Sequence, residues 1–155
     1  PEEHVEKFRE RLNELCTLTE KDLTEVVRID IAMPFSYVSE QLVEELSLLE
    51  PFGKGNEKPI FADKNLKIKK LQILGKAGNV LKLTIENSTN YRMTAIMFDR
   101  TQEFMGFIKE KFGQEEINKA LLGQNNAITF MATFYPTINE FRGNIDLQIV
   151  IDRFC

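Results

Sequence analysis

The sequence predicts a mainly β fold, a five-stranded barrel preceded by a helical N-terminal arm. Apolar residues recur at helical spacing in residues 3–16, whereas from Asp63 onward they alternate with polar residues at a period of two. Turns rich in glycine and asparagine separate the alternating runs. A single amphipathic helix interrupts the strands after the third one.

The arm is predicted to contain a helix, a strand and a second helix. An amphipathic helix over 3–16 follows from apolar positions spaced by 3, 4, 3 and 1, which are Val5, Phe8, Leu12, Leu15 and Cys16. Residues 26–31 have the β-branched content of a strand. The second helix is capped by Ser36 or Ser39 and ends at Pro51, because the residue before a proline disfavours helical backbone.

The strands that follow are predicted at 66–74, 80–85, 91–98, 127–135 and 144–151. Residues 75–79 and 87–90 form turns, the helix spans Phe104 to Phe112, and residues 136–143 form the last loop. The order β-β-β-α-β-β is that of an OB-fold, a five-stranded Greek-key barrel. SH3-like barrels are the nearest alternative, and they lack the helix after the third strand.

Three parts are expected along the chain. One helix, one strand and a connecting helix are too little for a domain, so residues 1–33 are predicted to be the tail of a larger domain. Residues 34–50 are the connecting helix, and residues 51–155 are the OB-fold and nucleic-acid-binding domain.

Composition places the chain among globular proteins. It has 155 residues, of which 43% are hydrophobic and 28% charged. No apolar run approaches the ~18 residues of a membrane span, and the acidic first turn is unlike a signal peptide, so we expect a cytoplasmic protein without a membrane partner. Cys16 and Cys155 form neither a disulfide framework nor a zinc site, and both are interpreted as incidental.

The charge is unevenly distributed. Residues 1–50 hold 5 Lys and Arg against 13 Asp and Glu, a net charge of −8, whereas residues 51–155 hold 15 against 11, a net of +4. Within 51–92 the ratio is nine basic residues to three acidic ones. Such asymmetry is typical of a nucleic-acid partner, although a lysine-rich solvated surface would also produce it.

An OB-fold binds its ligand across the second and third strands, between the loops that join strands one and two and strands four and five. Single-strand binding needs cations for phosphates and aromatic rings for bases. Residues of both kinds occur in these places, namely Lys76, Lys82, Tyr91, Arg92, Phe141 and Arg142. The competing interpretation is that Phe141 is a core residue and Lys76 only keeps a hairpin soluble.

The run from Glu50 to Phe61 combines two glycines and two prolines, a composition that presents backbone. It is not a P-loop, because the Gly-Lys-Ser/Thr ending is missing. Lys54, Gly55 and Asn56 could still hold one phosphate with bare amides and a cation. The alternative is a helix stop and a rigid entry to the first barrel strand.

No catalytic machinery is visible in the sequence. The single histidine, His4, lies near the N-terminus, and the carboxylates Asp99, Glu103, Asp146 and Asp152 are scattered singly. Two metals need a cluster of ligands, which is missing, so no catalytic residue, metal site or cofactor is predicted in this chain.

The pattern Pro51-Phe52-Gly53-Lys54-Gly55-Asn56, entered from a Leu/Glu-rich helix and left through Pro59-Ile60-Phe61, resembles the junction before the OB-fold of RecJ-type single-strand-specific exonucleases. Further segments support the resemblance. Phe8-Arg9-Glu10-Arg11-Leu12-Asn13 resembles the helix that closes the family's DHHA1 domain, and Leu147-Gln148-Ile149 with Asp152 fits the last OB strand.

The resemblance implies a C-terminal fragment of a DHH/DHHA1 protein. Such a parent degrades single-stranded DNA from the 5′ end with Mn²⁺ or Mg²⁺, in recombination and repair. This chain would then bind single-stranded DNA, and a single-strand-binding protein is a candidate for a further partner. A protein-interaction module and a free-standing RNA-binding OB-fold stay open, since composition alone does not separate DNA from RNA.

Overall fold

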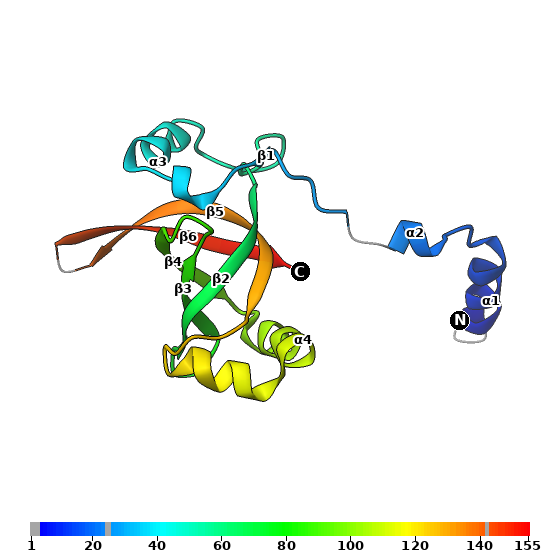
Figure 1. Cartoon of the computed structure of the whole chain (residues 1–155). Helices are drawn as coiled ribbons and strands as arrows, with labels where there is room; N and C mark the ends of the chain where they lie inside the picture. Colours follow the sequence, from blue (N-terminus) through cyan, green and yellow to red (C-terminus); the bar gives the residue numbers. More distant parts are fainter. Residues whose placement is uncertain (1–3, 24–25, 142) are drawn as a thin grey trace.

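The computed structural model describes residues 4–23, 26–141 and 143–155. The N-terminal arm begins with α1 (Val5–Leu15) and α2 (Glu20–Leu23), which lie away from the rest of the chain (Figure 1). The predicted amphipathic helix is therefore present. It buries none of its residues, so its apolar stripe has no packing partner within the described chain.

The barrel is built from five strands and one long helix. These are β2 (Phe61–Leu74), β3 (Val80–Glu86), β4 (Arg92–Phe98), α4 (Thr101–Leu121), β5 (Thr129–Phe141) and β6 (Asn144–Phe154). The sheet order is β1-β2-β3-β4-β6-β5, and a further β2–β5 pairing closes it. Only β4 and β6 among the five pair in parallel. This arrangement confirms the predicted OB-fold.

Closure depends on the long strand β2, which has two barrel partners. Its first half pairs with β5, from Phe61 opposite Phe134, and its second half pairs with β3, up to Leu74 opposite Val80. The β2–β3 register shifts between Ile68 and Lys70. Such bulges bend and twist a strand, which lets one strand pass from one neighbour to the next.

One hydrophobic core fills the barrel. Inward positions alternate along the strands, and α4 covers the core with Phe104, whose ring centroid lies 5.2 Å from that of Phe130 and 4.9 Å from that of Phe154. α4 bends at Gly113, where φ is +83°, a conformation that favours glycine. The bend divides one helix into two segments that both contribute buried residues.

The segment before the barrel docks onto it. β1 (Ile31–Ala32) pairs in parallel with the start of β2. A 3₁₀ helix, η2 (Phe35–Tyr37), places Phe35 in the core, with its N–H donating to Asp63 Oδ2 at 3.0 Å. α3 (Glu40–Ser47) is capped by Ser39, whose Oγ accepts from the Leu42 N–H. Residues in the predicted connecting segment therefore belong to the barrel's core.

Two elements differ from the sequence prediction. The strand expected over 26–31 is only Ile31–Ala32, because only these residues find a partner strand. The loop expected over 136–143 is largely β structure, since β5 continues to Phe141 and pairs with β6 as far as Asn144. The proline in β5, Pro136, lies beyond the last β2 contact, where β5 has become an edge and tolerates it.

Candidate nucleic-acid interface

The outer face of β3 and β4 is polar and partly basic. Cross-strand pairs on this face are Lys82–Ile96, Thr84–Thr94 and Glu86–Arg92, while the alternating residues between them point into the core. The same rows continue onto β2, where Lys70 lies opposite Thr84 and Gln72 opposite Lys82. The predicted residues Lys82 and Arg92 thus share one surface, and both are exposed.

Arg92 is held by a carboxylate that the sequence analysis missed. Its Nε donates to Glu86 Oε2 at 2.7 Å, and Lys69 Nζ lies 3.5 Å from Glu86 Oε1. The Arg92 hydrogen bond, and then the charge of Lys69, hold the pKa of Glu86 below its usual value against the opposing effect of burial. The Arg92 side chain is still 60% exposed, so the pair is oriented at the surface.

The turn between β2 and β3 stands at one end of this face. Gly75 and Gly78 have positive φ, and the Gly78 N–H donates to the Gly75 carbonyl at 3.1 Å. Asn79 ties the turn to the end of β4, because its Nδ2 donates to Asp99 Oδ1 at 2.8 Å. The turn therefore presents the exposed Lys76 from an ordered base.

The opposite end of the face is bordered by the β5–β6 hairpin, which extends past the barrel (Figure 1). Phe141 ends β5, and its backbone pairs with Asn144. Arg142 and the side chain of Phe141 lie outside the described part of the chain. Their predicted roles stay predictions.

Tyr91 directly precedes β4. Its ring centroid lies 5.9 Å from that of Phe35, so one part of the ring packs against the docked segment. Its N–H donates to Asn87 Oδ1 at 3.0 Å, which fixes the preceding turn. The residue is 39% exposed, so the docked segment and the predicted binding face meet at this side chain.

The predicted glycine-rich loop is a small closed turn. Gly53 and Asn56 exchange two backbone hydrogen bonds of 2.9 and 3.0 Å. The Asn56 side-chain amide donates to the carbonyls of Leu49 and Pro51, so it holds the loop against the end of α3. Lys54 and Gly55 are exposed, and Gly55 has a φ of +85°. Asn56 therefore has a structural contact, whereas Lys54 projects into solvent.

A groove of about 840 Å³ lies between this loop and the barrel. Its walls come from α3, residues 58–60 and the ends of β4, β5 and β6, and they include Phe98 and Tyr135. Lys58 Nζ lies 4.2 Å from the Tyr135 ring centroid, and Phe52 contacts the same ring edge-on. Burial, and then the charge of Glu50, raise the pKa of the Tyr135 hydroxyl.

Sequence reasoning missed this groove. The outward position of Phe98 follows from the alternation along β4, so that signal was available. The approach of Lys58 to Tyr135 depends on a contact between residues far apart in the chain, which no local pattern encodes.

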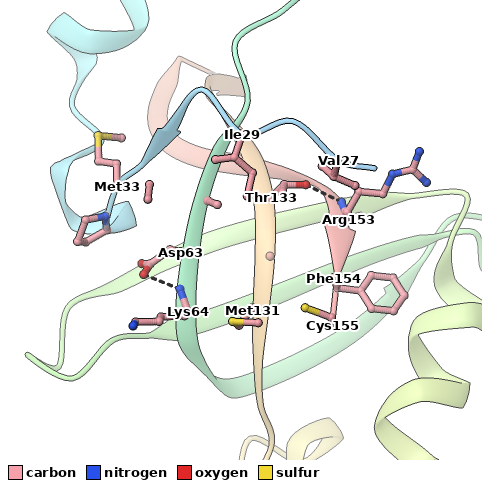
Figure 2. Close-up of a pocket in the computed structure, with 14 residues that line it drawn as sticks. Val27, Ile29, Met33, Asp63, Lys64, Met131, Thr133, Arg153, Phe154 and Cys155 are labelled. Carbon is pink, nitrogen blue, oxygen red and sulfur yellow. Dashed lines mark hydrogen bonds between the residues drawn. The ribbon is translucent and has the colours of Figure 1, made fainter. Parts of the chain in front are cut away.

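A second cavity, of about 560 Å³, is mainly apolar (Figure 2). Val27 and Ile29 of the docked segment face Met131 of β5 and Cys155 across it. Polar groups at its margin are internally bonded, since the Arg153 N–H donates to Thr133 Oγ1 at 3.0 Å. Its chemistry suits apolar side chains rather than nucleic acid.

The described residues do not fit a metal centre. They contain no group of three or more His, Cys, Asp or Glu side chains that could hold an ion. Within the same part of the chain, no helix has the length and apolar character needed to cross a membrane.

Comparison with known proteins agrees with the fold. The chain is 31% identical over 90 residues to the single-stranded-DNA-specific exonuclease RecJ of Bacillus subtilis strain 168, a match that covers 57% of this chain and 12% of that protein. Its fold is similar to the crystal structure of RecJ in complex with Mn²⁺ from Thermus thermophilus, with a TM-score of 0.62 and 16% identity. That similarity covers 100% of this chain and 19% of the other.

The match at the level of the family is broader. The family model described as the RecJ OB domain matches residues 29–153, which include the docked segment and all five strands of the barrel. The chain therefore belongs to the RecJ OB domain family.

Proposed function

We propose that this chain is the single-stranded-DNA-binding part of a RecJ-type exonuclease. The observation that supports it best is the continuous outer surface of β2, β3 and β4, on which Lys70, Lys82 and Arg92 lie on neighbouring strands. Cations so spaced follow a phosphate backbone without reading sequence. The turn with Lys76 and the β5–β6 hairpin border this surface at its two ends.

The residues proposed to contact DNA fall into two groups. Lys76, Lys82 and Arg92 provide cations on or beside the β3–β4 face, with Tyr91 at its margin, and Phe141 and Arg142 belong to the hairpin. Lys54 and Gly55 form the second group, next to α3, where Asn56 supports the loop through the carbonyls of Leu49 and Pro51. We assign phosphate contact to the cations and base stacking to the aromatic rings.

The chain spans 12% of the Bacillus relative and 19% of the Thermus chain, so the catalytic activity belongs to the proposal for a longer parent. In that parent, the chain guides a strand toward a separate catalytic domain that holds Mn²⁺ or Mg²⁺ and degrades DNA 5′ to 3′ in recombination and repair. We place the parent in the cytoplasm. Residues 1–33 form the tail of its DHHA1-like domain, residues 34–50 the connection, and residues 51–155 the OB-fold domain.

A second function, protein interaction, is favoured by one observation. The apolar cavity beside Met131 and Ile29 offers a surface suited to apolar side chains of another protein. A single-strand-binding protein is the proposed partner, because it would occupy the same DNA. Binding of RNA in place of DNA is a competing outcome that the experiment below separates.

The test is fluorescence anisotropy with labelled oligothymidine and oligouridine. We expect a dissociation constant on the order of 10⁻⁴–10⁻⁶ M at physiological salt, the range of sequence-independent electrostatic binding. Affinity should fall as salt rises, and Lys82→Ala should lower the slope by about 1, whereas Lys109→Ala on α4 should leave it unchanged. A flat salt response would remove phosphate contact, and strong preference for oligouridine would favour the RNA-binding function.

A further inference from the structure

The two groups of predicted DNA contacts are joined by one row of residues around the barrel. Lys82 lies opposite Ile96, which lies opposite Val150, which in turn lies opposite Tyr135. The row crosses β3, β4, β6 and β5 in spatial order. It begins at a cation of the β3–β4 face and ends at the ring beneath Lys58, in the loop segment that contains Lys54.

The groove lies at the far end of this row. Phe98, two residues after Ile96 on the outer face of β4, has 51% of its surface exposed and forms one wall. Tyr135 forms the opposite part of the lining, and its ring has a lysine ammonium over it at 4.2 Å. Two aromatic rings of this kind are a surface on which bases stack.

The charges in the groove favour a base over a phosphate. Lys58 and Arg100 line it with Glu50 and Asp152, so two cations face two carboxylates. Arg100 is already engaged, because it donates to the Asp152 carbonyl and to Glu103. Lys58 is the exposed cation of the set, at the edge nearest Lys54. A neutral, partly aromatic floor with a cation at its edge matches one nucleotide, base inward and phosphate outward.

We propose that this groove is a nucleotide subsite, in which a base of the single strand stacks on Phe98 and the adjoining phosphate is bound by Lys58. The subsite rests on the proposed function, since the strand reaches it from the β3–β4 face along the row from Lys82 to Tyr135. When phosphate attracts Lys58, the ammonium leaves the Tyr135 ring, and a second aromatic surface becomes available. The strand thus continues from the barrel face to the loop before β2.

Photo-crosslinking tests the location directly. Oligothymidines within the ~4–16-nucleotide site size of OB-folds, each carrying one 5-iododeoxyuridine, are irradiated with the 155-residue chain, and the modified peptides are identified by mass spectrometry. We expect crosslinks to Phe98 or Tyr135 from at least one position of the probe. Crosslinks restricted to the β3–β4 face and its bordering loops would overturn the subsite while leaving DNA binding intact.

Substitutions test the chemistry. Phe98→Leu keeps an apolar side chain but removes the ring, so affinity for oligothymidine should fall about five-fold or more. Tyr37→Leu, which changes an exposed ring outside the groove, is the matched control and should leave affinity unchanged. Lys58→Ala should lower the salt slope by about 1, with Lys109→Ala as its control.

The outcomes separate the two proposals. If the wild-type chain binds no single strand, the proposed function fails. If it binds with the expected salt dependence, and Phe98→Leu and Lys58→Ala behave as wild type, the subsite alone is wrong. Thermal unfolding of each variant shows whether a loss of affinity comes from a loss of folded protein.

Discussion

Glu86 and Arg92 face each other across β3 and β4, with Arg92 Nε donating to Glu86 Oε2 at 2.7 Å. Lys69 approaches the same carboxylate from β2 at 3.5 Å. One acidic side chain therefore orients two cations from the strands on either side of it. The only acidic residue of β3 lies in the middle of the surface proposed to bind DNA.

Replacing Glu86 should affect stability in a pH-dependent way. The pKa of Glu86 is lowered in the folded state, so the carboxylate stabilises the fold above the ordinary glutamate pKa of ~4.3. That contribution is lost as the pH falls through the lowered value. Glu86→Gln should therefore be less stable than wild type at pH 7, and urea unfolding should show the difference shrinking in acid. A difference that is constant down to about pH 2 to 3, the lower limit of carboxyl titration, would contradict this role.

The same substitution should alter DNA binding. Glu86→Gln removes a negative charge from the proposed binding surface and releases Lys69 and Arg92 from it. We expect tighter binding of oligothymidine at low salt and a salt slope steeper by about 1, measured by anisotropy. Weaker binding would show instead that orientation of Arg92 by Glu86 matters more than the charge.

The loop before β2 allows contact and support to be separated. Lys54→Ala should lower the salt slope of DNA binding by about 1 and change the free energy of unfolding by less than ~0.5 kcal/mol, because Lys54 is an exposed side chain. Asn56→Ala removes the hydrogen bonds to Leu49 and Pro51 and should cost about 0.5–1.5 kcal/mol per bond lost. An unchanged affinity and slope for Lys54→Ala would reduce the loop to a structural turn.

Asn126 provides a test of the fold itself. Its Nδ2 donates to the Ile68 carbonyl at 3.0 Å, and its Oδ1 accepts from the Ile128 N–H at 3.1 Å, so it joins the bulged part of β2 to the start of β5. Asn126→Ala leaves buried backbone groups unpaired and should cost about 1–3 kcal/mol in denaturant unfolding. The neighbouring Asn125 is exposed, and Asn125→Ala should cost less than ~0.5 kcal/mol. Equal effects would contradict the assigned role of Asn126.

The chain by itself should not cleave DNA. Hydrolysis assisted by two metals needs a set of ligands that holds them ~3.5–4 Å apart, and the described residues offer no such cluster. A labelled oligothymidine incubated with the chain and Mn²⁺ or Mg²⁺ should remain intact on a denaturing gel. Cleavage that persists through repeated chromatography, and is lost when a carboxylate of this chain is substituted, would overturn the proposal of a separate catalytic domain.

Local patterns were sufficient for much of the barrel. Alternation of apolar residues placed β2, β3 and β4 and identified their inward faces, because side chains of a strand point to opposite sides in turn. The glycines at 75 and 78 marked the β2–β3 turn, where positive φ is required. Lys82 and Arg92 were correctly placed on one surface for the same reason, since both lie at outward positions of paired strands.

Pairing decided the elements that sequence reasoning misplaced. Residues 26–30 have β-branched side chains but no partner strand, whereas Ile31 and Ala32 lie beside β2. Pro136 indicates a loop by composition, yet β5 continues through it because β6 supplies hydrogen bonds along the whole hairpin. Propensity describes what one residue tolerates, and strand formation depends on a distant neighbour.

The sequence by itself therefore determined the order of elements, the inward faces of the strands and the asymmetry of charge, all of which follow from local periodicity and composition. Only the tertiary structure decided that Phe35 completes the barrel core, that Glu86 holds Arg92, and that Lys58 covers Tyr135 beside an open groove. Each of these depends on barrel closure, which brings together residues that are far apart in the chain and whose contact energies no local pattern records.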